Sequence, residues 1–103
     1  MSLDTDTKKQ YRSIGHSLKP VVIIAGNGIS DGVLDELFRA LRDHELIKVK
    51  IAIEDREVRK AVAQEIIAQT SAEIVQEIGK VVLLFKKASK PNPKLTNLRF
   101  KVQ

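Results

Sequence analysis

The chain has 103 residues, of which 43% are hydrophobic and 30% charged, so it can bury one core but not two. It contains no cysteine and only two histidines, which excludes a disulfide framework or a thiolate zinc site and leaves little material for any other metal site. Residues 21–25 and 81–85 are the longest apolar runs and are too short to cross a bilayer, and residues 1–10 lack the apolar segment of a secretory signal. We therefore expect a small cytoplasmic domain without a membrane contact, a metal or a cofactor.

Basic residues outnumber acidic residues by 18 to 13, for a net charge of +5, and they are unevenly distributed. Residues 7–28 contain four basic residues and no acidic one, and the same is true of residues 88–103. A surface that is merely solvated more often mixes the two signs within each element. Segments of a single positive sign favour a polyanionic partner such as nucleic acid.

The first half of the chain predicts a helix, a strand and a second helix. Residues 7–18 place apolar side chains at helical spacing, and Pro20 ends this helix because it pushes the preceding residue toward extended geometry. Residues 21–24 are continuously apolar, which predicts a short strand buried on both faces. A second helix spans about residues 30–44. Its predicted core-facing stripe consists of Val33, Leu34, Leu37, Phe38 and Leu41.

The second half predicts a strand, a helix and a hairpin. Residues 46–53 alternate between apolar side chains and lysines, which predicts a strand with one buried face and one cationic face. A third helix spans about residues 55–70. Its inward residues are predicted to be Val58, Ala61, Val62, Ile66 and Ile67. Residues 73–78 and 80–87 read as two strands joined so tightly at Gly79 that they must form a hairpin.

These elements predict an α/β protein of the two-layer α+β kind, in the order α-β-α-β-α-β-β. The first two strands are joined through a helix and should be parallel, whereas the last two should be antiparallel. A mixed four-stranded sheet packed with three helices is the natural closure. We expect a flexible segment at residues 1–6, one domain at residues 7–87 and a loose basic tail at residues 88–103.

The turn after the first predicted strand is a candidate ligand site. Glycines at positions 26 and 28 flank Asn27, and Ser30 can cap the helix that follows. Such a turn lets a phosphate approach the backbone at a helix N-terminus, although glycine-rich turns of this kind are also common without a ligand. No Gly-Lys-Ser/Thr follows and a third glycine is missing, so neither a Walker loop nor a dinucleotide fingerprint is present.

No group of side chains predicts catalysis. No serine or cysteine is placed as an obvious nucleophile with either His16 or His44, so both are expected to be structural residues or hydrogen bonders. The acidic pair Glu54 and Asp55 is better explained by helix capping and by ion pairs with Arg56 and Arg59. The few aromatic residues give no serial base-stacking motif. We expect no catalytic residues, no small-molecule substrate and no enzymatic activity.

Five segments together resemble a known family. They are His16–Val22 (HSLKPVV), Gly26–Ser30 (GNGIS), His44–Lys50 (HELIKVK), Glu54–Glu57 (EDRE) and the Ile78-Gly79-Lys80 turn. This set resembles the CRM domain, the chloroplast RNA splicing and ribosome maturation domain, and above all its stand-alone bacterial form, the YhbY family. The resemblance covers about residues 7–87.

The resemblance implies an RNA-binding domain whose fold is similar to the C-terminal domain of translation initiation factor three. It also implies association with precursors of the large ribosomal subunit. The RNA-contacting loop of this family is a GxxG turn, and the matching positions are residues 25–28, where Ala25 replaces the first glycine.

We therefore expect a monomeric protein that binds structured rRNA during assembly of the large ribosomal subunit. The alternative is a ribosome-associated or translation-factor-like module whose main contact is protein. Phosphates would lie across the glycine turn and nearby cations. The predicted RNA-binding residues are Lys8, Lys9, Arg12, Lys19, Ala25, Gly26, Asn27, Gly28, Ser30, Lys48 and Lys50.

Overall fold

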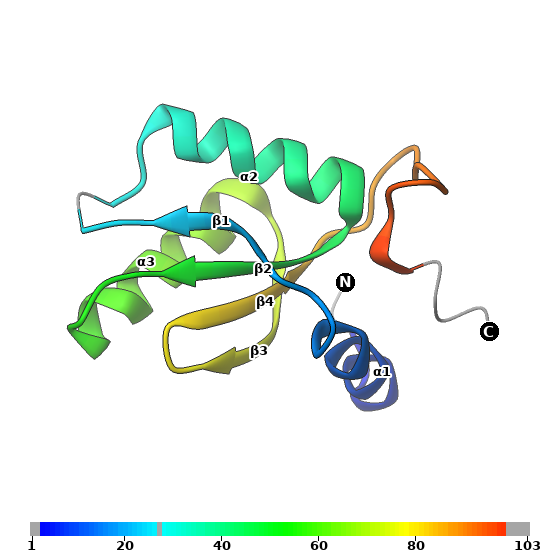
Figure 1. Cartoon of the computed structure of the whole chain (residues 1–103), viewed down its shortest axis with the longest axis horizontal. Coiled ribbons are helices and arrows are strands. Elements are labelled where there is room, and N and C mark those ends of the chain that lie inside the picture. The colour runs from blue at the N-terminus through cyan, green and yellow to red at the C-terminus, as the bar shows by residue number, and fades with distance from the viewer. Residues whose placement is uncertain (1–2, 27, 99–103) are drawn as a thin grey trace.

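The computed structural model of the chain describes residues 3–26 and 28–98. Within these residues, three helices and four strands follow one another in the predicted order (Figure 1). They are α1 (Thr5–Gly15), β1 (Pro20–Ile24), α2 (Asp31–His44), β2 (Leu46–Ile51), α3 (Arg56–Thr70), β3 (Glu73–Ile78) and β4 (Val81–Phe85). The strands form one mixed sheet in the order β1-β2-β4-β3, so the predicted fold class is confirmed.

Strand pairing follows from the connections. β1 and β2 are parallel because α2 carries the chain back between them, and β2 and β3 both pair with β4 in antiparallel fashion. The hairpin predicted at Gly79 is present as β3 and β4. β1 and β3 are the edge strands, while the strongly apolar β2 and β4 lie in the centre.

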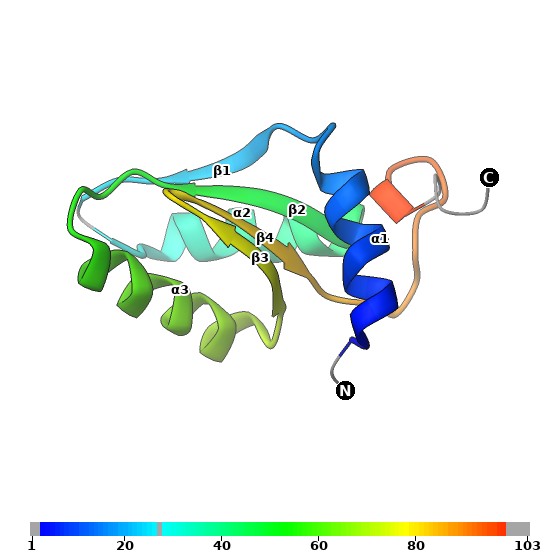
Figure 2. The same cartoon turned by 90° about the horizontal axis from the view of Figure 1, so that it is seen from below.

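Apolar clusters pack against both faces of the single sheet, so they belong to one domain. Helices α2 and α3 cover one face, where Ile24, Leu37, Ile66 and Leu84 are fully buried. Helix α1 covers only one end of the other face and encloses a smaller cluster there. This cluster consists of Tyr11, Leu46, Val75 and Leu83. Figure 2 shows α1 crossing the strands at the end opposite the 25–30 turn.

Gly15 allows α1 to pack this closely on the sheet. A Cβ atom at this position would lie 2.7 Å from a methyl group of Leu83, which is itself 2% exposed. A glycine that weakens the helix locally is therefore required by the tertiary contact.

The predicted helix caps at Ser30 and Asp55 are confirmed. The Ser30 hydroxyl accepts the Val33 N–H at 3.2 Å, and the Asp55 carboxylate accepts the Glu57 and Val58 N–H groups at 2.8 and 3.2 Å.

Helix α1 begins and ends earlier than the spacing predicted, since it covers residues 5–15 rather than 7–18. The Asp4 side chain accepts the Thr7 N–H at 2.7 Å, which starts the helix at Thr5. The N–H of Leu3 donates to the Glu73 carboxylate at 2.9 Å. Residues 3–6 are thus part of the folded unit, and the prediction of a flexible N-terminus is wrong for them.

Five apolar side chains that the sequence predicts to be buried are exposed, so these predictions are wrong. Strand β1 is buried on one face only, with Val21 and Ile23 48% and 62% exposed, because α1 does not reach this edge strand. Phe38 on α2 is 44% exposed, since the sheet lies beneath Leu37 and Leu41 instead. On α3, Val58 and Ala61 are exposed, and the inward face is formed by Val62, Ala63, Ile66 and Thr70.

The segment after β4 was predicted to be loose, and this prediction is wrong for residues 88–98, which we call the C-terminal strap. The strap folds back on the end of α2, where the buried Glu45 carboxylate accepts the Ala88 N–H at 2.9 Å and the Thr96 hydroxyl at 2.7 Å. The Asn97 amide donates to the Leu46 carbonyl at 2.6 Å. A buried carboxylate needs such donors, and the strap supplies them.

Candidate functional site

One end of the molecule gathers the turns that follow β1, β2 and β3, and we call it the loop end (Figure 1, left). Strands β1 and β2 both finish here, and the Ala52 N–H donates to the Ile24 carbonyl at 2.7 Å. Because the strands are parallel and followed by helices, α2 and α3 both begin at this end. Two helix N-termini therefore lie at the same end of the molecule as the glycine turn, and that of α2 directly follows it (Figure 1).

The glycine turn exposes backbone with little side chain around it. Ala25 and Gly26 are exposed, and the Gly28 N–H donates to the Ala25 carbonyl at 3.0 Å. Gly28 has φ of +80°, a backbone conformation that favours glycine, and a Cβ at Gly26 or Gly28 would meet no atom within 4 Å. Asn27 lies outside the described residues. The turn can thus approach a flat or bulky ligand closely.

The N-terminus of α2 is more available to an anion than that of α3. Asp55 occupies two N–H groups of α3 and brings a negative charge to its first turn. At α2, the exposed Ser30 hydroxyl accepts a hydrogen bond from the Val33 N–H. The N–H groups of Asp31 and Gly32 have no intrahelical acceptor. The partial positive charge of a helix N-terminus favours a phosphate at this position, although the Asp31 carboxylate lies nearby and opposes it.

Three of the predicted cations lie on the sheet face that α2 and α3 leave open. Lys48 is half-buried and lines a cavity of about 220 Å³ together with Lys19. Lys50 is exposed and pairs in register with Ile23 of β1 and Val81 of β4. Lys19, Lys48 and Lys50 therefore form a line along this face toward the loop end, and we call them the sheet lysines.

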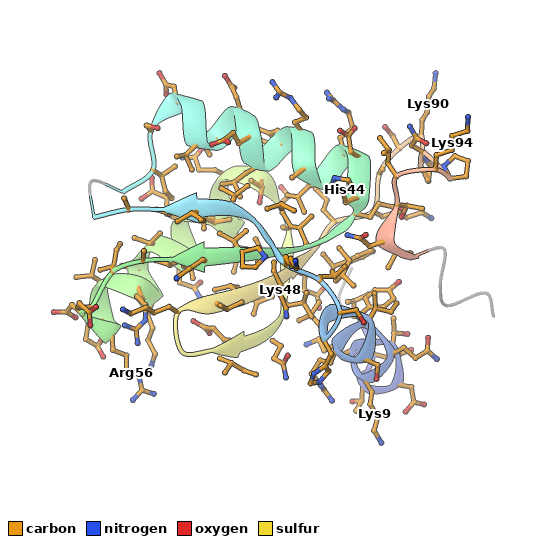
Figure 3. The ribbon with its side chains drawn as sticks, viewed as in Figure 1. Lys9, His44, Lys48, Arg56, Lys90 and Lys94 are labelled. Atoms are coloured by element: carbon orange, nitrogen blue, oxygen red, sulfur yellow. The ribbon has the colours of Figure 1, made fainter. Side chains whose placement is uncertain are left out.

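The remaining predicted cations lie on α1, at the other end of the sheet. Lys8 has an acidic partner, since its ammonium lies 3.7 Å from the Glu73 carboxylate, so it is not the unpaired cation that the sequence indicated. Lys9 points away from Lys48 (Figure 3). Arg12 is half-buried and makes no ion pair among the described residues. The structure does not bring these three side chains together with the glycine turn.

Sequence reasoning missed a second cationic group at the loop end. Arg56, Arg59 and Lys60 line a cavity of about 360 Å³ together with Glu77 and Gly79. The sequence indicated ion pairs of Arg56 and Arg59 with the preceding acids, whereas in the structure Arg59 donates to the carbonyls of residues 53 and 54 at 2.9 and 2.8 Å. The sequence pattern that could have predicted this group is the presence of three basic residues within the first turns of one helix.

Glu54 forms its ion pair with a residue of the hairpin. The Lys80 ammonium lies 2.6 Å from the Glu54 carboxylate, and this hydrogen bond, with the charge of Lys80, lowers the pKa of Glu54 below its usual value. The pair links the β2–α3 turn to the β3–β4 turn at the exposed edge of the loop end.

Among the residues that the structure describes, neither histidine lies in a group of acids that could hold a metal ion. Nδ1 of His44 lies 2.7 Å from the Leu95 carbonyl, which can only accept, so Nδ1 carries the proton and His44 holds the strap as a hydrogen bonder. Within residues 3–26 and 28–98, no three His, Asp or Glu side chains are grouped so that they could hold a metal ion. None of the helices in the described part of the chain is long and apolar enough to cross a membrane.

Comparison with known proteins identifies the family. The sequence model of the CRS1/YhbY (CRM) domain matches residues 3–86. A Pseudomonas aeruginosa protein named as a probable RNA-binding protein is 53% identical over 98 residues, which cover 95% of this chain and 94% of the relative. A Haemophilus influenzae protein named RNA-binding protein is 42% identical over 85 residues, with coverage of 82% and 86%.

A solved structure agrees with this result. The solution structure of a hypothetical protein from Staphylococcus aureus superimposes with a TM-score of 0.75 at 26% sequence identity, and the match covers 86% of this chain and 93% of that chain. The chain belongs to the CRS1/YhbY (CRM) domain family, which confirms the resemblance seen in its sequence. The family match ends just before the C-terminal strap.

Proposed function

We propose that this protein binds RNA without catalysing a reaction, and that the RNA backbone lies across the glycine turn and the sheet lysines. The observation that carries the proposal is the glycine turn itself, which presents bare backbone and the N-terminus of α2 at one exposed end. Membership of the CRM family and the names of two relatives support RNA as the ligand.

We propose further that the RNA is structured rRNA in precursors of the large ribosomal subunit, that the protein assists their assembly in the cytoplasm, and that it acts as a monomer. This step rests on what the family resemblance implies. Crosslinking in cells, followed by sequencing of the bound RNA, tests it directly. Enrichment of large-subunit precursor rRNA supports the proposal, and a distribution that follows RNA abundance would contradict it.

A single added carboxylate tests the interface. The Gly26→Asp variant places a negative charge in the turn, and nothing within 4 Å obstructs the new side chain. We expect at least about a tenfold loss of affinity for purified precursor rRNA, which corresponds to about 1.4 kcal/mol. Filter binding at fixed salt measures the affinity, and circular dichroism checks the fold.

Gln69→Glu provides the matched control. It also lowers the net charge by one, but it lies on the exposed face of α3 near the helix C-terminus, about 20 Å along the helix from the loop end. This control should bind RNA with nearly unchanged affinity. If the two variants lose affinity equally, only net charge matters and the turn is not the interface.

A protein contact is the second candidate function, and one observation favours it. The open sheet face exposes Val21, Ile23 and Ile78 beside the sheet lysines, with 62% and 63% exposure for the two isoleucines. Exposed aliphatic side chains are more typical of protein interfaces than of phosphate contacts. A binding measurement with purified rRNA that is free of ribosomal proteins separates the two candidate functions. An RNA-binding protein should bind this rRNA, whereas a module whose main contact is protein should not.

A further inference from the structure

Phe38 is the most exposed aromatic side chain among the described residues, and its surroundings are cationic. It is 44% exposed on α2, whereas Tyr11 is buried and Phe85 is half-buried against it with ring centroids 5.1 Å apart. Exposing an aromatic ring to water forgoes the stabilisation that burial would give. The position of this ring therefore calls for an explanation.

Phe38 lines a groove of about 250 Å³ between α2 and the chain that follows β4, which we call the Phe38 groove. Its floor is apolar and formed by the buried Leu41 and Ala88. Ligand pockets for drug-sized molecules usually measure about 300–1,000 Å³, so this open groove suits one flat group rather than a whole ligand.

The rim of the groove carries Arg42, Lys86 and Lys87. The acidic groups nearby are Asp43, which lies 3.5 Å from the Arg42 guanidinium, Asp35, one turn before Phe38 on α2, and the buried Glu45 carboxylate, which accepts the Ala88 N–H. Lys87 is exposed and makes no ion pair among the described residues. Lys90 of the strap also lies at this end of the molecule, near the end of α2 that carries His44 (Figure 3). The local charge is positive.

From these contacts we infer that the Phe38 groove binds one unpaired nucleotide of a single-stranded RNA segment. The base stacks on the Phe38 ring, and the adjoining phosphates contact Arg42 and Lys87. Proteins that bind single-stranded nucleic acid combine an aromatic ring, on which a base stacks, with cations that contact the phosphates. Such a site accepts any base, because every base has a π-face. A protein partner fits less well, because three cations would need matching acids around a groove of this size.

The inference rests on the proposed RNA-binding function and adds a second contact to it. Phe38 lies seven residues after the start of α2, about 10 Å along the helix axis from the N-terminus beside the glycine turn. One RNA molecule can therefore contact both places, with its backbone at the turn and an unpaired base at the groove. The C-terminal strap completes the groove through Ala88, which is held by Glu45.

A tryptophan reporter tests the inference directly. The chain contains no tryptophan, so Phe38→Trp provides a single fluorophore at the proposed stacking position. Titration with single-stranded oligouridine should quench its fluorescence in proportion to binding. Gln69→Trp, which places the same fluorophore on the exposed face of α3, should show no quenching.

Two further variants measure the stacking itself. Phe38→Leu keeps an apolar side chain and the fold but removes the π-face, so it should weaken oligouridine binding about five- to hundredfold, whereas Phe38→Tyr should bind like the wild type. If Phe38→Trp is not quenched and Phe38→Leu binds like the wild type, the groove is no RNA contact. If, in that case, the Gly26→Asp variant still binds RNA more weakly than the wild type, only this inference fails. If the wild type itself binds no RNA, the proposed function fails as well.

Discussion

At the residue scale, the two glycines of the turn play different roles that the sequence does not separate. Gly28 has φ of +80°, whereas Gly26 has an ordinary backbone conformation, and both positions have open space for a Cβ. We expect Gly28→Ala to lower the free energy of unfolding by about 1–2 kcal/mol, the cost of a left-handed conformation for an alanine. Urea denaturation should show no such loss for Gly26→Ala, and equal losses would contradict the difference in backbone conformation.

The ion pair between Glu54 and Lys80 is the second residue-scale feature that can be tested. Since Lys80 lowers the pKa of Glu54, the pair stabilises the fold above the pKa of Glu54 in the unfolded chain, and this contribution is lost as the pH falls through the lower pKa of the folded state. An NMR titration of Glu54 should give a higher pKa in Lys80→Gln than in the wild type. Lys80→Arg, which keeps the charge, should leave the pKa low.

At the element scale, the C-terminal strap depends on one buried carboxylate at the end of α2. Glu45 is 4% exposed and has φ of +64°, and it accepts hydrogen bonds from both Ala88 and Thr96. Glu45→Ala removes these acceptors while leaving the donors in place. An unsatisfied buried donor costs about 1–3 kcal/mol. The free energy of unfolding of the variant should therefore be lower by about 1–3 kcal/mol or more.

Urea denaturation and amide exchange measure this effect. The Ala88 amide should exchange faster in Glu45→Ala, since its acceptor is gone. Glu36→Ala, at an exposed position on the same helix, should change the stability by less than about 0.5 kcal/mol. An unchanged exchange rate at Ala88 would mean that the Glu45 carboxylate does not protect this amide and that the other contacts of the strap hold it in place.

At the scale of the whole molecule, charge should control the affinity for RNA. If four or five phosphates are contacted, the logarithm of affinity falls against the logarithm of salt concentration with a slope near −3, at about 0.7 per phosphate on single strands. Between about 50 and 200 mM salt the affinity should thus fall roughly sixtyfold. A titration series measures the slope, and a nearly flat dependence would contradict a backbone contact.

The basic tail makes a separate contribution at this scale. Residues 88–103 carry four basic residues and no acid, so they supply most of the net charge of +5. The strap holds Lys90 and Lys94 at the end of the molecule away from the glycine turn (Figure 3). Changing both to glutamine should reduce the salt slope without abolishing binding, because the turn itself is unaltered.

The sequence alone determined the order and type of every element, because these depend on local periodicity and turn chemistry. The alternation in residues 46–53, the caps at Ser30 and Asp55 and the hairpin at Gly79 are all properties of neighbouring residues. The glycine turn was identified in the same way, since its position after a strand and before a helix is local. That this turn and the sheet lysines bind RNA stays a prediction.

Only the tertiary structure decided which apolar side chains are buried and which distant segments meet. Ile23 and Phe38 belong to apolar stripes but are exposed, because α1 and the sheet cover other positions. The strap is held by Glu45, a residue about fifty positions away from Thr96, and no local pattern reports such a contact. Burial depends on pairs of elements that are distant in sequence, and this is the physical reason that the Phe38 groove could be found only in the folded molecule.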